Sequence, residues 1–214
     1  MGRVLGPALR PAPGSRRRRR RSLRSALIED TFDLAGRQVT LLRPPNADEL
    51  IDEDAFDDDE FLPYWAELWR SGVALAEIVS TLDVRQKRVL ELGAGLGLPS
   101  LAAALRGAKV LATDWADDAV ALLRANAKRN SIRLRVKRVR WDAPDALLRE
   151  APWQLVLGAD LLYEERNAAQ LLDLLPQLGG EIVIADPGRP FAKDFFARWE
   201  VETLADGVYR LRLP

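Results

Sequence analysis

Short apolar runs alternate with longer stretches in which apolar residues recur every three or four positions, over most of the chain beyond residue 68. A short apolar run bounded by glycine or charged residues is typical of a buried parallel strand, although periodicity alone does not separate it from a short buried helix. The longer stretches have the spacing of amphipathic helices. The repeated order of strand and helix predicts an α/β fold with a doubly wound sheet.

Seven strands and the helices between them follow from this pattern. The strands are expected at residues 88–92, 109–113, 134–140, 154–159, 181–185, 200–204 and 208–213, and the helices at 68–82, 99–105, 117–130, 164–178 and 191–198. Asp206-Gly207 joins the last two strands and is a strong hairpin signal, so the sheet should end in an antiparallel pair. Asp117 is expected to cap the helix that begins there. A separate small hairpin, residues 31–43, should turn near Ala35-Gly36.

Composition divides the chain into three parts. Residues 1–25 form a leader rich in Pro, Gly, Ser and Arg, with an unbroken run of arginines at 16–21 and no acid before Glu29. Such a segment has too little apolar content to fold and is predicted to be disordered. Residues 26–80 form an N-terminal extension, and residues 81–214 form the domain that contains the sheet.

The leader and an acidic stretch each allow more than one interpretation. The leader has the composition of an organelle transit peptide, but its prolines and consecutive arginines work against an amphipathic helix. It could also bind nucleic acid; the preferred interpretation is a dispensable segment or a start codon placed too early. Residues 48–60 are strongly acidic, with a short helix expected near residues 47–51. We interpret them as a solvated connection rather than a negative rim that attracts a basic substrate.

The amino-acid composition limits the catalytic and metal-binding chemistry that the chain can perform. The chain of 214 residues balances 32 Lys and Arg against 32 Asp and Glu, and it contains neither Cys nor His. This excludes disulfides, thiolate metal sites, cysteine nucleophiles, iron–sulfur radical chemistry, imidazole bases and His-ligated zinc. No apolar run approaches the roughly 20 residues that span a membrane. Carboxylates, Tyr, Lys, Arg, Ser and Thr remain as reactive groups.

A glycine-rich turn follows the first predicted strand of the sheet. Gly93, Gly95 and Gly97 stand at alternate positions, and a helix opens directly after them. A dinucleotide fingerprint requires the spacing G-x-G-x-x-G, which this turn lacks. Glu91 precedes the glycines, where a carboxylate disfavours a pyrophosphate and favours a cationic ligand. The turn therefore argues against a nicotinamide dehydrogenase.

Acidic residues stand at the carboxyl ends of the other strands, where open α/β sheets bind their ligands. Asp114 comes about 20 residues after the glycines, where such folds keep an acid for ribose hydroxyls. Trp141-Asp142, Asp160 and Asp186 follow later strands. These acids are distributed one per strand, which argues against a metal cluster. Packing remains the alternative for Trp141, a turn or cap for Asp142 and a helix N-cap for Asp160.

Four segments together resemble a known family. They are Pro63-Tyr-Trp-Ala-Glu-Leu-Trp69, Glu91-Leu-Gly-Ala-Gly-Leu-Gly97, Trp141-Asp142 and Ala159-Asp-Leu-Leu-Tyr163. This combination resembles methyltransferase family 16, class I seven-stranded enzymes that use S-adenosyl-L-methionine and are mostly protein lysine methyltransferases. The first segment and Asp186-Pro-Gly-Arg-Pro190 most resemble the branch that methylates the electron-transfer flavoprotein β subunit, with its bacterial relatives. Arg70 departs from the proline of many relatives.

The resemblance implies a Rossmann-like class I methyltransferase fold and a role for each matching residue. The implied cofactor-binding residues are Trp69, Glu91, Gly93, Ala94, Gly95, Gly97, Asp114, Trp141, Asp142 and Ala159. It also implies that Asp160 and Tyr163 shape the acceptor site. We interpret Asp160 as an orienting group first and a proton acceptor second, because a carboxylate favours the ammonium form of a lysine. Core packing remains the alternative for Tyr163.

The resemblance predicts an N-methyltransferase acting on a protein lysine, with no metal and no membrane. A small-molecule N-methyltransferase and an inactive cofactor-binding scaffold remain alternatives, as does a nucleic-acid binder driven by the leader. Nucleic-acid amino-methylation is disfavoured, because the fourth strand does not end in the N/D-P-P-Y/F sequence of that chemistry. We expect a monomer in a bacterial-type cytoplasm, or in the mitochondrial matrix if the leader is a transit peptide.

Overall fold

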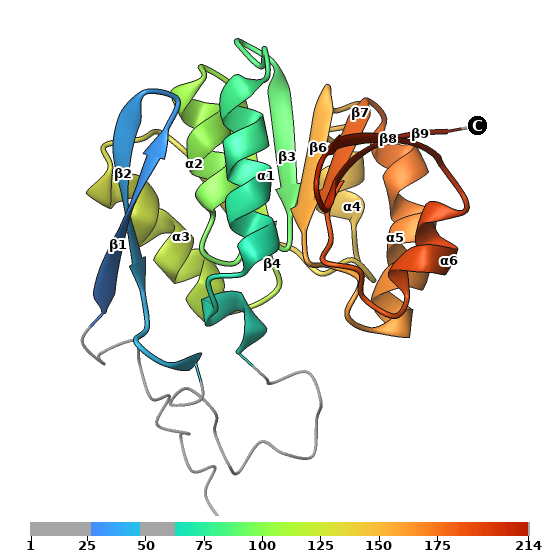
Figure 1. Cartoon of the computed structure of the whole chain (residues 1–214), viewed down its shortest axis with the longest axis horizontal. Helices are drawn as coiled ribbons and strands as arrows, with labels where there is room; N and C mark the ends of the chain where they lie inside the picture. The colour runs from blue at the N-terminus through green and yellow to red at the C-terminus, as the bar shows by residue number, and fades with distance from the viewer. Residues whose placement is uncertain (1–26, 48–62, 214) are drawn as a thin grey trace, which may run out of the picture.

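A computed structural model describes residues 27–47 and 63–213 (Figure 1). The leader, the acidic stretch at 48–60 and all but the first residue of the helix expected near 47–51 lie outside the described residues. Within them, no helix is long and apolar enough to cross a membrane. The division of the chain into leader, extension and sheet domain stays a prediction.

The core of the molecule is one seven-stranded sheet with the order β5-β4-β3-β6-β7-β9-β8. Its strands are β3 (Arg88–Leu92), β4 (Lys109–Asp114), β5 (Arg135–Arg138), β6 (Leu155–Ala159), β7 (Glu181–Ala185), β8 (Glu200–Ala205) and β9 (Val208–Arg212). β3 to β7 are mutually parallel, whereas β9 is antiparallel to both β7 and β8. The predicted α/β class, the seven strands and the antiparallel end are confirmed.

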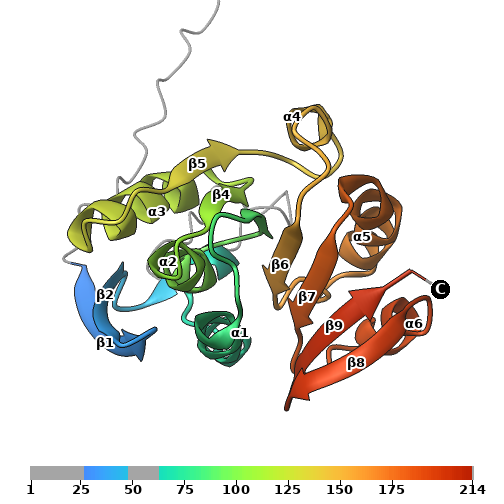
Figure 2. The same ribbon diagram turned by 90° about the horizontal axis from the view of Figure 1, so that it is seen from above.

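Helices cover both faces of the sheet (Figure 2). The first face carries α1 (Arg70–Thr81), α2 (Leu98–Leu105) and α3 (Asp117–Arg129), and the second carries α4 (Asp145–Leu148), α5 (Glu165–Leu178) and α6 (Ala192–Phe196). Successive strand residues point to opposite faces, so Val89 and Leu90 are buried in different clusters. Burial on both faces explains why these strands read as continuous apolar runs.

The N-terminal hairpin packs against α3 rather than standing apart from the sheet. β1 (Ile28–Leu34) and β2 (Arg37–Arg43) pair antiparallel, and the turn residues Ala35 and Gly36 both have positive φ, as a type I′ turn requires. The predicted hairpin is thus confirmed. Asn126 accepts the Leu42 N–H at 2.7 Å and donates to the Leu42 carbonyl at 3.2 Å. Its amide also donates to the Leu96 carbonyl, which ties the hairpin to the glycine-rich turn.

Two sequence predictions need correction. Asp117 does not cap α3: it is the first helical residue, Ala116 holds the cap position, and no side chain caps that end. Asp117 instead lies 3.6 Å from the Arg138 guanidinium. The strand expected over 134–140 is also shorter, because β5 pairs on one side only and covers Arg135–Arg138.

The buried amide of Asn126 generates a stability prediction. Asn126→Ala should lower the free energy of unfolding by about 2–4 kcal/mol, because it removes three hydrogen bonds and leaves backbone groups of the hairpin and the glycine turn unpaired. Urea denaturation measures the loss. The matched control is the half-buried Asn130→Ala, which breaks bonds to Thr40 and to α3 but none to the glycine turn. Equal losses in the two variants would contradict this interpretation of Asn126.

Candidate active site

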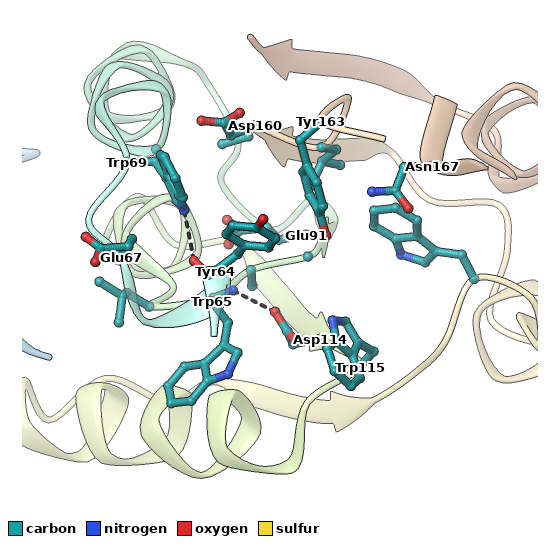
Figure 3. Close-up of a pocket in the computed structure, with 18 of the residues that line it drawn as sticks. Tyr64, Trp65, Glu67, Trp69, Glu91, Asp114, Trp115, Asp160, Tyr163 and Asn167 are labelled. Carbon is teal, nitrogen blue, oxygen red and sulfur yellow. Dashed lines mark hydrogen bonds between the residues drawn. The ribbon is translucent and has the colours of Figure 1, made fainter. Parts of the chain in front are cut away.

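A cavity of about 350 Å³ opens at the carboxyl ends of β3, β4 and β6 (Figure 3). Its lining includes all twelve residues that the sequence singled out: Trp69, Glu91, Gly93, Ala94, Gly95, Gly97, Asp114, Trp141, Asp142, Ala159, Asp160 and Tyr163. They come from five separate segments of the chain. The fold therefore brings them together at the carboxyl ends of the strands, where ligands of open α/β sheets bind, although the role of each residue stays a prediction.

The glycine turn has a backbone that other residues would not tolerate. Gly93, Gly95 and Gly97 all have positive φ, from 51° to 83°. A Cβ on Gly93 would lie 2.7 Å from Leu161 Cδ2, and one on Gly97 would lie 2.3 Å from Leu123 Cδ2. Glycine is needed here for both conformation and space, so the backbone forms one wall of the cavity.

Asp114 holds this turn in place. Its Oδ2 accepts the Gly95 N–H at 2.9 Å and its Oδ1 accepts the Ala116 N–H at 3.0 Å. Burial raises the pKa of this carboxyl above its usual range, and these backbone donors oppose the shift. Each carboxylate oxygen can accept a second hydrogen bond, so Asp114 can bind a hydroxyl of a ligand while it still holds the turn in place.

Glu91 is 2% exposed and has one side-chain donor, the Ser100 hydroxyl on α2, which bonds to Oε2. Burial raises the pKa of Glu91 to about 8, and the hydrogen bond from Ser100 only partly opposes this. The carboxyl is thus largely protonated at neutral pH. A ligand cation beside it would favour the charged form, so the site fits a ligand with a positive group at this end.

Trp141, Asp142 and Ala159 also line the cavity. The Trp141 ring lies over Gly93, 3.4 Å from where a Cβ would stand. Asp142 is engaged by the Arg140 guanidinium through bonds of 2.9–3.3 Å, which lower the pKa of Asp142. The structure therefore places Asp142 at the rim in an ion pair, and a ligand amine there would share it with Arg140.

The aromatic segment after residue 63 closes one side of the cavity. Tyr64–Ala66 form a short 3₁₀ helix, and Trp69 Nε1 donates to the Tyr64 carbonyl at 2.9 Å. The Tyr64 ring lies 5.2 Å from that of Tyr163 and 6.4 Å from that of Trp69. The Trp65 carbonyl lies 3.0 Å from the Cβ position of Gly95, so the segment fits against the glycine turn. Because Tyr64 and Trp65 make these contacts, we add them to the site.

Asp160 is buried beside α1 and has a φ of 56°, unusual for a residue with a side chain. Its Oδ1 accepts Arg189 Nε at 2.7 Å, and its Oδ2 accepts the Ser71 hydroxyl at 3.2 Å. It is not a helix N-cap, since α5 begins at Glu165 and Glu164 holds that position. Ser71 and Arg189 escaped the sequence analysis, although Arg189 stands in the Asp-Pro-Gly-Arg-Pro segment quoted there.

Tyr163 points into the cavity, and burial raises the pKa of its hydroxyl above the usual range. Asn167, on the first turn of α5, faces this hydroxyl and opposes the shift only in part (Figure 3). The Asn167 Nδ2 atom is buried and has no hydrogen-bond partner among the described residues. An unpaired donor aimed at the cavity is available to a ligand acceptor or to a bound water.

The sequence is similar to those of known methyltransferases. A family model described as "Lysine methyltransferase" matches residues 60–196. The electron transfer flavoprotein beta subunit lysine methyltransferase of Xenopus laevis is 36% identical over 137 residues, which cover 59% of this chain and 53% of that protein. Protein N-lysine methyltransferase METTL21A of Danio rerio is 36% identical over 127 residues, covering 56% of this chain and 58% of that protein. The chain thus spans little more than half the length of these relatives.

A solved structure shows the same fold at lower identity. The 16S rRNA N2 G1207 methyltransferase of T. thermophilus, solved in complex with AdoMet and guanosine, has a TM-score of 0.62 and 19% identity. The match covers 88% of this chain and 50% of that one. At this identity the likeness establishes the fold alone.

The buried Glu91 predicts a dependence of stability on pH. Between about pH 5 and 8 the folded protein keeps a proton on Glu91 that the unfolded chain, with a pKa near 4.5, has lost. The free energy of unfolding should therefore fall as pH rises, by up to about 1.4 kcal/mol per pH unit. Glu91→Gln removes this contribution, so wild type should lose stability relative to the variant from pH 5 to pH 8.

Urea denaturation at pH 5, 6, 7 and 8 measures the difference. Glu67→Gln is the control, because it removes an exposed carboxylate from the lining of the same cavity and should keep the wild-type dependence on pH. Parallel curves for wild type and Glu91→Gln would show that Glu91 ionises normally in the folded protein.

Proposed function

The chain belongs to the lysine methyltransferase family, and on that premise we propose that it is an S-adenosylmethionine-dependent N-methyltransferase acting on a lysine side chain of a protein. The observation that carries the proposal is the arrangement of Glu91 and Asp114 on either side of a glycine turn with positive φ. Glu91 suits the cationic amino-acid end of the cofactor, and Asp114 suits its ribose hydroxyls.

We assign the remaining cofactor contacts from the same cavity. The backbone of Gly93, Ala94, Gly95 and Gly97 cradles the methionine part, and Trp69 packs beside it. Trp141, Asp142 and Ala159 surround the adenine. The fit is supported by the space that the glycines leave and by the pair of backbone donors that fix Asp114.

When bound, the cofactor would supply a methyl group on a sulfonium. The acceptor nitrogen would bond to that carbon as the carbon–sulfur bond breaks, with the electron pair left on sulfur. Because the leaving group is already good, the task of the protein is mainly alignment, which can lower a barrier by several kcal/mol. The Tyr64, Trp69 and Tyr163 rings line the acceptor side and suit the aliphatic stem of a lysine. Asp160 and Tyr163 orient the acceptor nitrogen.

We propose the β subunit of an electron-transfer flavoprotein as the first acceptor to test, because one relative is named for that substrate. We also propose that the protein is a monomer and that it acts on a protein rather than on nucleic acid. Its proposed location is a bacterial-type cytoplasm, or the mitochondrial matrix if residues 1–25 are a transit peptide.

The cofactor assignment predicts selective binding. S-adenosylhomocysteine should bind with micromolar affinity in calorimetry, and NAD should not bind. Asp114→Ala should weaken binding at least tenfold, because it removes both the ribose acceptor and the bond that braces Gly95. Asp114→Asn keeps one acceptor oxygen and should lose less. If S-adenosylhomocysteine does not bind, the methyltransferase proposal is wrong.

The reaction assignment predicts transfer of a labelled methyl group to lysine. The purified chain, labelled S-adenosylmethionine and the recombinant flavoprotein β subunit are incubated, and mass spectrometry locates the modified residue. Asp160→Asn should reduce the rate by about 10²-fold or more while S-adenosylhomocysteine still binds, because only the acceptor nitrogen loses its orienting group. A cell lysate tested in parallel covers other acceptors. Methylation confined to small molecules in the lysate would contradict a protein acceptor.

A further inference from the structure

The carboxylate at the acceptor end of the cavity is already neutralised by the protein itself. The Asp160 side chain is 4% exposed, and both of its oxygens have partners: Arg189 Nε on Oδ1 and the Ser71 hydroxyl on Oδ2. A charge-assisted bond of 2.7 Å to a buried carboxylate is a strong interaction. An incoming ammonium would therefore find Asp160 occupied by another cation.

Arg189 reaches this position from a loop that is built to present it. Asp186 Oδ1 accepts the N–H groups of Gly188 and Arg189, each at 2.8 Å, and Gly188 has a φ of 91°. The Arg189 guanidinium also lies 5.3 Å from the ring centroid of Trp69, which lines the cavity. Asp186 thus fixes the backbone of Arg189, and Asp160 and the Trp69 ring hold its side chain, so its charge is kept beside Asp160.

Asp186 interacts electrostatically with both members of this pair but does not line the cavity. It is 1% exposed. Burial raises its pKa, and Asp160 contributes to the same shift. An acceptor nitrogen in the cavity therefore meets the Asp160–Arg189 pair, whose net charge is zero.

We propose that Arg189 is a positioning residue that neutralises Asp160, so that the acceptor end of the cavity takes an uncharged amine in preference to an ammonium. This inference rests on the proposed function and adds the selection of the protonation state. An ammonium has no lone pair with which to attack a methyl group, and a free lysine has a pKa of about 10.4. An unpaired carboxylate would stabilise that unreactive form.

The geometry leaves Asp160 able to orient the amine. Each carboxylate oxygen can accept a second hydrogen bond, so an amine N–H can bind beside Arg189 without displacing it. The proton of the lysine ammonium is lost to solvent before the amine enters. Asp160 thus orients the amine that attacks the methyl group. Arg189 prevents Asp160 from binding the ammonium form of the lysine.

A pair of cofactor analogues tests this without an acceptor protein. Sinefungin carries a primary amine on carbon where S-adenosylmethionine carries the methyl sulfonium, and S-adenosylhomocysteine has nothing at that position. The ratio of their dissociation constants at pH 7.5 therefore reports how the site treats an ammonium at the transfer position. Calorimetry on the full chain gives both constants. The ratio also cancels any general effect of a mutation on cofactor packing.

Arg189→Gln should increase the preference for sinefungin over S-adenosylhomocysteine about tenfold, because it removes the charge that competes for Asp160. Arg189→Lys restores the charge and should keep the wild-type ratio. Arg166→Gln is the control: Arg166 is an arginine in the cavity lining, and its guanidinium pairs with Glu164 rather than Asp160. It too should keep the wild-type ratio.

Three outcomes overturn the inference in distinguishable ways. An unchanged ratio in Arg189→Gln means that Asp160 is not controlled by Arg189. The same increase in Arg189→Lys as in Arg189→Gln means that the effect is one of shape rather than charge. If wild type binds neither analogue, the cofactor assignment fails, and this inference fails with it.

Discussion

The hydrogen bond from the Gly95 N–H to the Asp114 carboxylate is the interaction on which the site depends. It joins the turn after β3 to the end of β4, and so it sets the distance between the two strands' ligand groups. The turn has a backbone that only glycine tolerates without strain, and its next carbonyl, that of Leu96, accepts from Asn126. Because Asn126 also binds the N-terminal hairpin, a segment far from the sheet in sequence supports the cavity wall.

The buried acids are the second constraint, since their partners differ. Glu91 is kept largely neutral by burial, whereas Asp160 is kept in an ion pair with Arg189. A cationic ligand that binds beside Glu91 would favour the ionised form of this carboxyl and then be attracted to its negative charge. Beside Asp160, the fixed guanidinium of Arg189 disfavours the binding of a second cation. The chain thus separates a cation-binding end from an amine-binding end within one cavity.

Much of the fold could be read from local patterns. The β3 strand and the turn after it were found because an apolar run, alternate glycines and a following helix are all short-range signals. The strand-end rule indicated that Glu91, Asp114, Asp142 and Asp160 would lie at one edge of the sheet, and the family resemblance implied the rest of the twelve residues that line the cavity. Boundaries at the edge of the sheet were less predictable, since β5 pairs on one side only and stops before Arg140.

The features that the sequence did not predict depend mostly on contacts between segments that are far apart in the chain. Ser71 and Asp160 are 89 residues apart, and Arg189 and Asp160 are 29 apart, so no local pattern links either pair. The helix cap expected at Asp117 is wrong because α3 already begins at Asp117, which leaves Ala116 in the cap position. The four-residue helix α4 is too short to give a periodic signal.

The most direct test of the central claim is a crystal structure of the chain with S-adenosylhomocysteine. The structure predicts the ligand's ammonium near Glu91, its ribose hydroxyls on Asp114 and its adenine beside Trp141, with the Asp160–Arg189 pair intact beyond the sulfur. A ligand bound elsewhere, or a ribose that makes no contact with Asp114, would contradict the assignment of this cavity as the cofactor site.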